Sequence, residues 1–248
     1  MNLIFIADYS KQAALFCRVK NLEINEAEKF LKQLARKVFL AAPSTQVHLF
    51  LPVETRKLLF KKNESEQYLN KIAEIRTTLI HFFTYDFHLI NTLVNAFKTA
   101  QNKDFEQVVK TGQYGGYYQK ILNDMKQLLS TGKTILPRLR TPEESEDFIE
   151  GVHFKTNTGN EIYPEDLSHG ELKRLSIYAW IQSRSMQDSI VLMDEIENGF
   201  HPDWQYQIVV DLTEWAPSNQ YILATHSYEL CQAVTPAHVK EIEPKLLP

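Results

Sequence analysis

The chain has 248 residues, of which 44% are apolar and 23% are charged, so it can bury one large core, with or without an inserted segment. Its net charge of −4 excludes a uniformly basic surface, although a local basic patch stays compatible with it. Its two cysteines, Cys17 and Cys231, match neither a disulfide framework nor a metal-binding spacing, which indicates a reducing, intracellular compartment.

Residues 1–8 carry no basic leader, and their apolar run is too short for a signal peptide or a membrane span. We therefore expect a cytoplasmic protein without a membrane partner.

The first half of the chain predicts mainly helices. A short strand is expected over 3–7, a helix over 25–41 and a second strand over 47–51. Between 53 and 111 there is neither glycine nor proline, and apolar residues recur at three- and four-residue steps. This spacing predicts one long amphipathic helix or two helices with a soft bend, followed by a helix over 117–129.

The second half changes character. Residues 141–144 have the pattern of a capping box at the start of a helix, and 152–155 and 161–163 flank turn residues in the manner of a hairpin. From 167 onward, helices and strands alternate: helices are expected over 170–186, 202–214 and 227–233, and strands over 189–193 and 220–224. This alternation predicts an α/β fold with a parallel sheet flanked by helices.

We expect three segments along the chain. Residues 1–52 form a partial N-terminal lobe, 53–150 a helical insertion or lid, and 151–248 a C-terminal lobe.

Two adjacent carboxylates, Asp194 and Glu195, follow the apolar strand 189–193. Ligands of parallel sheets bind at the carboxyl ends of the strands. Nucleotide hydrolysis needs a hard cation held by oxygen ligands and a residue that orients water. Asp194 could hold Mg²⁺ while Glu195 faces the attacking water. The alternative is a pair of solvated charges at a strand end or a helix N-terminus.

Two further segments point to phosphate. Ser168 and Gly170 stand where a helix begins, and there free backbone N–H groups and the positive end of the helix dipole attract anions. Alternatively, Ser168 is an N-cap that forms a capping box with Glu171. His226 ends the strand over 220–224, where it could donate to a phosphate oxygen or to water, or serve as a hydrogen-bonded structural histidine.

In this order, the three motifs resemble the signature motif, the Walker B pair and the switch histidine of ABC-type ATPase heads. Residues 197–202, with the sequence ENGFHP, resemble the segment after Walker B in the soluble AAA-type branch. That branch includes chromosome-maintenance, overcoming-lysogenization-defect and anti-phage defence ATPases. The resemblance covers about 150–245 and implies a P-loop NTPase-like fold.

The resemblance also implies a mechanism in which two heads, copies of one chain or related subunits, pack head to tail around ATP and Mg²⁺. Asp194 would bind the metal, and Glu195 and His226 would be catalytic, all three acting on the ATP of their own head. The nucleotide of the opposite subunit would contact the signature residues, which are Ser168, His169, Gly170 and Glu171. Asn198 and His201 would lie at the dimer seam. His169 and Glu171 stand where the family most often has Gly and Gln, and the helix-start geometry is retained.

The Gly-rich phosphate loop of these heads does not occur in the sequence. In the single Gly132-Lys133-Thr134 match, Gln127 occupies the position of the first glycine, and a helix precedes it where the loop needs a strand. We interpret this match as a helix C-cap followed by a loop. We therefore expect a truncated, split or partial ATPase that hydrolyses ATP when a phosphate loop is supplied from elsewhere.

Two other functions stay open. The chain could be a catalytically inactive, truncated ATPase that acts as an interaction or regulatory subunit through an apolar stripe over 64–101. Binding of nucleic acid rests on family analogy alone. The basic residues that could contribute to it, or form a solvated face, are Arg36, Lys37, Lys57, Lys61, Lys62 and Lys71. We expect no nuclease activity, because no nuclease domain follows His226.

Overall fold

The structure is a computed structural model. It describes residues 2–10, 13–19, 22–58, 61, 65–79, 81–86, 89–129, 132–138 and 151–242. The capping box predicted at 141–144 lies outside these residues.

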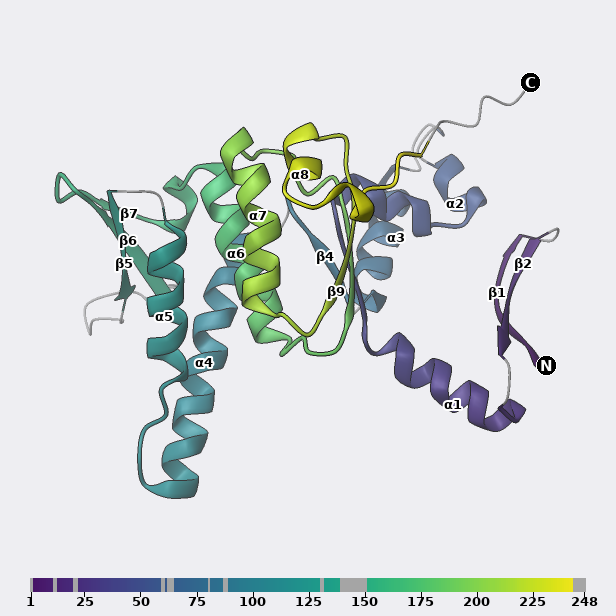
Figure 1. Cartoon of the computed structure of the whole chain (residues 1–248), viewed down its shortest axis with the longest axis horizontal. Coiled ribbons are helices and arrows are strands. Elements are labelled where there is room, and N and C mark those ends of the chain that lie inside the picture. Colours follow the sequence, from purple (N-terminus) through teal and green to yellow (C-terminus); the bar gives the residue numbers. More distant parts are fainter. Residues whose placement is uncertain are drawn as a thin grey trace.

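The first part of the chain contains β1 (Asn2–Ser10), β2 (Ala13–Val19), α1 (Ile24–Ala35), β3 (Val38–Ala42), a 3₁₀ helix (Ser44–Phe50), α2 (Val53–Lys57), α3 (Ser65–Thr78), β4 (Phe82–Thr84), α4 (Leu89–Thr111) and α5 (Tyr117–Leu128) (Figure 1). The second part contains β5 (Lys133–Arg138), β6 (Gly151–Thr156), β7 (Glu161–Ile162), α6 (His169–Ser183), β8 (Ile190–Asp194), α7 (Pro202–Trp215), β9 (Gln220–Ala224) and α8 (Tyr228–Gln232).

The central sheet has the strand order β4-β3-β8-β9, and all three pairings are parallel. Its core includes Trp180 of α6, Leu212 of α7 and Leu230 of α8, which pack with Val191 and Met193 of β8. The predicted α/β fold with a parallel sheet and flanking helices is therefore confirmed. In the described part of the chain, the helices and strands after 167 lie within a few residues of their predicted bounds.

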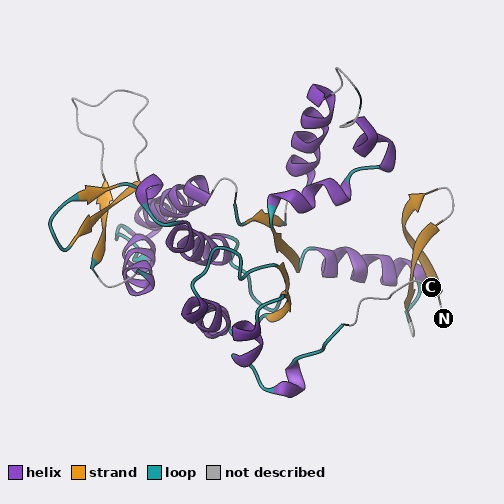
Figure 2. Ribbon diagram, turned by 90° about the horizontal axis from the view of Figure 1, so that it is seen from above, coloured by secondary structure: helices purple, strands orange, loops and turns teal. Residues whose placement is uncertain are grey.

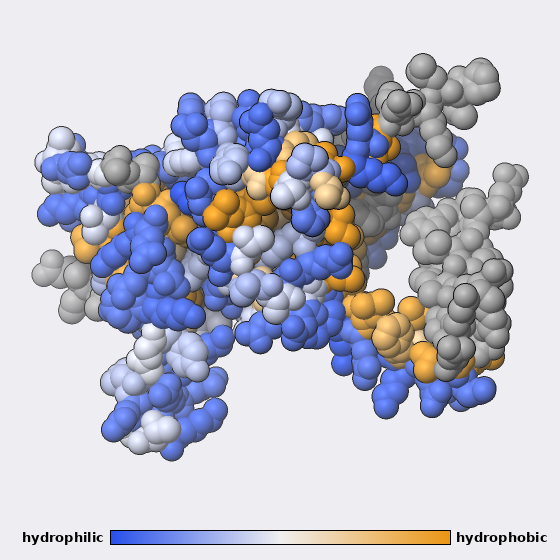
Figure 3. Space-filling view, in the orientation of Figure 1, coloured by the Kyte–Doolittle hydropathy of each residue, from blue (hydrophilic) through white to orange (hydrophobic). Residues whose placement is uncertain are grey.

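Two antiparallel units lie at opposite ends of the molecule, the β1–β2 hairpin at one end and the sheet β5-β6-β7 at the other (Figure 2). The hairpin predicted around 157–160 is confirmed as β6–β7, and β5 extends it. Helix α1 is amphipathic, and its apolar residues Ile24, Phe30 and Leu34 are exposed (Figure 3).

Two predictions for the first half are wrong, and a third is right in part. The helix over 25–41 ends at Ala35, because 38–42 becomes β3 between β4 and β8. Strand pairing on both sides there overrides a helical apolar spacing. The strand over 47–51 is a 3₁₀ helix followed by a bend, in which Val47 and Leu51 are both buried.

The stretch without glycine or proline contains the separate helices α3 and α4, as in the two-helix alternative, but β4 lies between them in place of a soft bend. Phe82 and Phe83 of β4 pair with Leu40 and Ala41. The apolar stripe of 64–101 serves the protein's own core over much of α4, where Leu93 and Phe97 are fully buried.

Strands β3 and β4 come from the predicted N-terminal lobe and helical insertion, yet both belong to the sheet of β8. The segment boundaries at 52 and 150 stay a prediction. Among the described residues, no helix is both long and apolar enough to cross a bilayer.

Candidate functional site

The carboxyl edge of the central sheet brings Asp194, Glu195 and His226 together. Asp194 is the last residue of β8 and pairs with Ala224, the last residue of β9. The Glu195 N–H then donates to the Ala224 carbonyl at 3.0 Å, and His226 follows two residues later. Glu195 has a φ of +51°, a left-handed conformation that is uncommon for any residue except glycine. Such strained backbone is often found at functional sites.

The loop that follows β8 is hydrogen-bonded to both Glu195 and His226. The Asn198 amide donates to Glu195 Oε2 at 2.8 Å, and Glu197 Oε1 accepts the backbone N–H of His226 at 2.8 Å. Glu197 is buried, and its Oε2 has no hydrogen-bond partner among the described residues. The sequence analysis assigned no role to Glu197, although a carboxylate two residues after Glu195 was a visible signal.

Burial raises the pKa of Asp194, and the neighbouring Glu195 and Glu197 carboxylates raise it further, while His226 lowers it. A cation bound at Asp194 would relieve this crowding of negative charge, so the donor set fits a magnesium ion. The described residues contain no group of three His, Cys, Asp or Glu side chains arranged around one metal. Oxygens of nucleotide and water would therefore complete the coordination, as they usually do for Mg²⁺.

A buried lysine that the sequence analysis missed supports the same loop. Lys173 is 0% exposed, and its Nζ donates to the carbonyls of Ile196 at 2.7 Å and Asn198 at 2.8 Å. The ammonium also lies 4.2 Å from the centre of the Tyr85 ring and 4.9 Å from that of Phe200. Burial lowers the pKa of Lys173 to about 7, although Glu197, Asp86 and Glu195 oppose the shift. In the sequence Lys173 lies in the middle of a predicted helix, between Leu172 and Arg174, and no local pattern indicates this contact.

Tyr85, just beyond β4, is buried beside Lys173. Burial raises the pKa of its phenol well above the usual value, and the charges of Asp194 and Glu197 raise it further. Its hydroxyl has no hydrogen-bond partner among the described residues. The phenol therefore stays neutral beside the carboxylates, and it too was absent from the sequence prediction.

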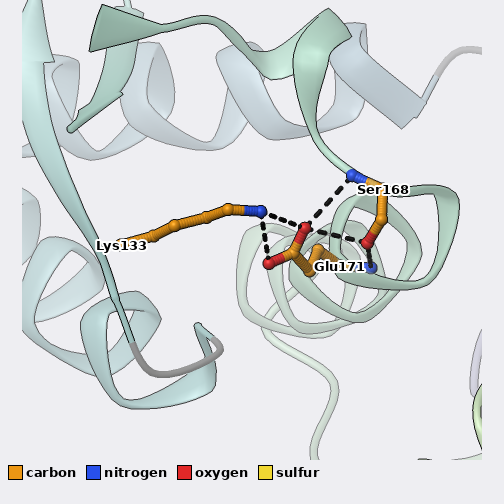
Figure 4. Close-up of polar contacts among 3 residues, drawn as sticks. All are labelled: Lys133, Ser168 and Glu171. Atoms are coloured by element: carbon orange, nitrogen blue, oxygen red, sulfur yellow. Dashed lines mark hydrogen bonds and ion pairs between the residues drawn. The ribbon is translucent and has the colours of Figure 1, made fainter. Parts of the chain in front are cut away.

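The predicted signature segment begins α6 with a complete capping box. Ser168 is the N-cap, and its Oγ donates to Glu171 Oε2 at 2.8 Å and accepts the Glu171 N–H at 3.3 Å. The Ser168 N–H donates to the same carboxylate oxygen at 3.1 Å. Lys133 also holds this carboxylate (Figure 4). The capping alternative thus describes the local geometry, and any role of Ser168 towards phosphate is additional to it.

Two glycines fit the start of α6 against the loop after β8. A Cβ at Gly170 would lie 2.9 Å from the Gly199 carbonyl oxygen. Gly199 has a φ of +81°, and a Cβ there would lie 2.5 Å from the imidazole of His169. Gly170 is therefore buried against its own chain, whereas Ser168 and His169 are exposed.

The residues predicted at the dimer seam are both exposed, and both follow β8. Asn198 bonds Glu195 as described above. His201 is the N-cap of α7, where its Nδ1 accepts the Asp203 N–H at 3.4 Å.

The Gly132-Lys133-Thr134 match is not a phosphate loop. Helix α5 ends at Leu128, so the predicted helix C-cap at Gly132 is wrong. Gly132 instead turns the chain with a φ of +106°, and Lys133 and Thr134 pair with Thr156 and Lys155 in an antiparallel sheet. A strand replaces the predicted loop because the backbone of these two residues pairs with β6.

Comparison with known proteins places this site in a family. A relative, "Retron Vc95 probable ATPase" of Vibrio cholerae serotype O1 biovar El Tor, is 36% identical over 95 residues, which cover 34% of this chain and 18% of the relative. The matched region thus spans less than a fifth of that protein.

Two solved structures also match. The SmcHead bound to the C-winged helix domain of ScpA is 14% identical and has a TM-score of 0.42, with 69% of this chain and 55% of that chain covered. The SMC head domain from Thermotoga maritima is 15% identical and has a TM-score of 0.33, with 54% and 44% covered.

The family model described as "AAA domain, putative AbiEii toxin, Type IV TA system" matches residues 26–232. This range includes all four strands of the central sheet and every residue of the carboxyl-edge site. Because the match extends over more than half of the chain, the protein belongs to this family of AAA domains.

Proposed function

We propose that the chain is the part of an AAA-type ATPase that carries the signature motif and the catalytic glutamate, and that it hydrolyses ATP with Mg²⁺ where two heads pack head to tail. The observation that carries the proposal is the meeting of Asp194, Glu195 and His226 at one edge of a parallel sheet. Family membership supports ATP as the ligand at this edge.

Each residue of this edge has a distinct role in the proposal. Asp194 binds Mg²⁺, which neutralises phosphate charge when it is present. Glu195 orients the attacking water, and Asn198 holds its carboxylate through the 2.8 Å hydrogen bond. His226 faces the phosphate that this water attacks, and Glu197 holds the His226 backbone N–H in place.

The predicted signature segment contacts the nucleotide that the partner head binds. Ser168 and His169 are exposed at the start of α6, and the positive end of the helix dipole there favours an anion. Gly170 and Glu171 are both buried and support this helix start from the side of the protein core. Asn198 and His201 line the seam between the heads.

The phosphate loop comes from elsewhere in the assembly. In the single sequence match to such a loop, the lysine already has a partner, because Lys133 is bound to Glu171. Strand β9 is one of the two edge strands of the described sheet, and its Ile222 is 51% exposed. An edge strand can pair with a further strand, so the β9 edge supports a neighbouring strand from the partner that carries the phosphate loop.

ATP turnover tests the proposal. We expect the chain alone to hydrolyse ATP no faster than its Glu195→Gln variant, because most contacts to the β- and γ-phosphates are missing. Adding the phosphate-loop segment of a family head as a separate fragment, so that it completes the head that carries Glu195, should produce hydrolysis. That hydrolysis should be lost with Glu195→Gln and retained with Glu214→Gln, an exposed glutamate remote from the site.

The outcomes separate the parts of the proposal. Fast, Glu195-dependent turnover by the isolated chain would refute the missing loop. Turnover in the mixture that is insensitive to Glu195→Gln would refute the catalytic role of Glu195.

An interaction subunit is the second candidate, and the tip of the α4–α5 hairpin favours it. The hairpin projects from the body of the protein (Figure 1), and Phe105, Val109 and Tyr114 near its tip are 62%, 72% and 78% exposed. Asp104 stiffens the tip by accepting the N–H groups of Tyr117 and Tyr118, both at 2.9 Å.

A further inference from the structure

The lysine of the Gly132-Lys133-Thr134 motif has a defined partner that the proposed function does not use. Lys133 Nζ lies 2.8 Å from Oε1 and 2.6 Å from Oε2 of Glu171, so the ammonium binds both carboxylate oxygens (Figure 4). The Glu171 side chain is 4% exposed and that of Lys133 is 24% exposed. The pair therefore joins β5 to the first turn of α6 at a partly buried position.

The same carboxylate also accepts a hydrogen bond from the Ser168 hydroxyl. A serine hydroxyl has one proton, and here it points to Glu171 Oε2 at 2.8 Å. A Ser168 that donates to phosphate must first give up this bond. Glu171 would then still accept from the Ser168 N–H and from Lys133, so its buried charge would stay satisfied.

Charge gives a second reason for the lysine. A carboxylate beside the helix start would repel an incoming phosphate, and this repulsion is strong where little water screens it. An ammonium bound to both carboxylate oxygens cancels the charge at close range. Without Lys133, Glu171 would lose this charge compensation at the position where the anion has to approach.

We infer that Lys133 is a positioning residue of the signature site: it neutralises Glu171 and keeps that carboxylate satisfied when the Ser168 hydroxyl turns to a phosphate. The inference rests on the proposed function, because it takes Ser168 as a phosphate ligand. Lys133 thus acts, through Glu171, on the phosphate that the partner head binds.

The test uses inorganic phosphate as the probe and the backbone amide NMR signals of His169, Gly170 and Glu171 in the full chain. We expect Glu171→Gln to tighten phosphate binding about three- to tenfold, because it leaves an uncompensated ammonium beside the site. Lys133→Met should weaken binding by a similar factor. The double variant Lys133→Met/Glu171→Gln, which carries neither charge, should bind phosphate about as the wild type does.

Two controls separate this role from a purely structural one. Lys133→Arg keeps the charge and should restore wild-type binding. Lys155→Met removes an exposed lysine from the neighbouring strand β6, opposite Thr134, and should leave binding unchanged. Near-ultraviolet circular dichroism checks the fold of each variant. If Lys133→Met fails to fold, Glu171→Gln and the double variant still decide the sign.

The opposite signs are the decisive result. A purely structural ion pair predicts that both single variants weaken phosphate binding or that neither changes it, and either result would overturn the inference. A wild-type chain whose three amide signals ignore phosphate would instead overturn the ligand role of Ser168, and the inference with it.

Discussion

Gly170 and Gly199 show at the residue scale why the start of α6 and the loop after β8 behave as one unit. Each glycine leaves room that a single methyl group would fill, since the added Cβ atoms would lie 2.9 Å from a carbonyl oxygen and 2.5 Å from an imidazole carbon. Close backbone packing therefore helps to hold the predicted signature residues in place relative to Glu195, together with the Lys173 hydrogen bonds.

Gly170→Ala should destabilise the protein by about 1–3 kcal/mol, because the methyl group meets a backbone oxygen that cannot rotate away. Urea unfolding measures the change. Gly116→Ala is the matched control, since no atom lies within 4 Å of the added Cβ and its φ is −118°. It should cost at most about 1 kcal/mol, through its N-cap position. Equal losses at both positions would contradict the packing argument.

Lys173 makes the stability of the loop depend on pH. Its folded-state pKa of about 7 lies below the unfolded value of 10.5, so the unfolded chain binds more protons between these values. Stability due to this group must therefore rise as pH increases from about 7 towards 10.5, by up to about 1.4 kcal/mol per pH unit. Below pH 7 the cost of burying the charged ammonium is fully present.

The measurement compares urea unfolding of the wild type and Lys173→Met across this window, which subtracts the other titrating groups. We expect the free-energy difference between the two proteins to move in favour of the wild type as pH rises. A constant difference would mean that Lys173 keeps an ordinary pKa in the folded protein.

At the scale of elements, α6 is the hub of the molecule. Its first turn carries the predicted signature residues, and its second turn carries Lys173. Beside Lys173, Arg174 binds Asp211 of α7 at 2.7 and 3.0 Å. Arg174 also donates to the Leu128 carbonyl at the end of α5. One helix thus connects the helical hairpin, α7 and the loop of Glu195.

Asp211→Ala should cost about 3–5 kcal/mol, because it leaves the Arg174 guanidinium buried without its carboxylate. Thermal or urea unfolding measures the loss. Glu214→Ala removes an exposed carboxylate from the same helix and should change stability by less than about 0.5 kcal/mol. A small effect of Asp211→Ala would show that water reaches Arg174 in the folded protein.

At the scale of the whole molecule, the central sheet is assembled from distant parts of the chain. Strands β3 and β4 lie between 38 and 84, whereas β8 and β9 lie between 190 and 224. A local reading placed the first two in helices because Val38, Phe39 and Phe82 fit a helical apolar spacing as well as a strand. The pairing that decides between the two states involves residues about 150 positions apart.

The sequence alone determined the order of helices and strands after 167, the meeting of Asp194, Glu195 and His226 at one sheet edge, and the family resemblance. These follow from local apolar periodicity and from the rule that parallel strands share a carboxyl edge. The tertiary structure alone decided the roles of Lys133, Lys173 and Glu197. Their partners lie 23 to 38 residues away in the chain, and no local pattern encodes contacts of that range.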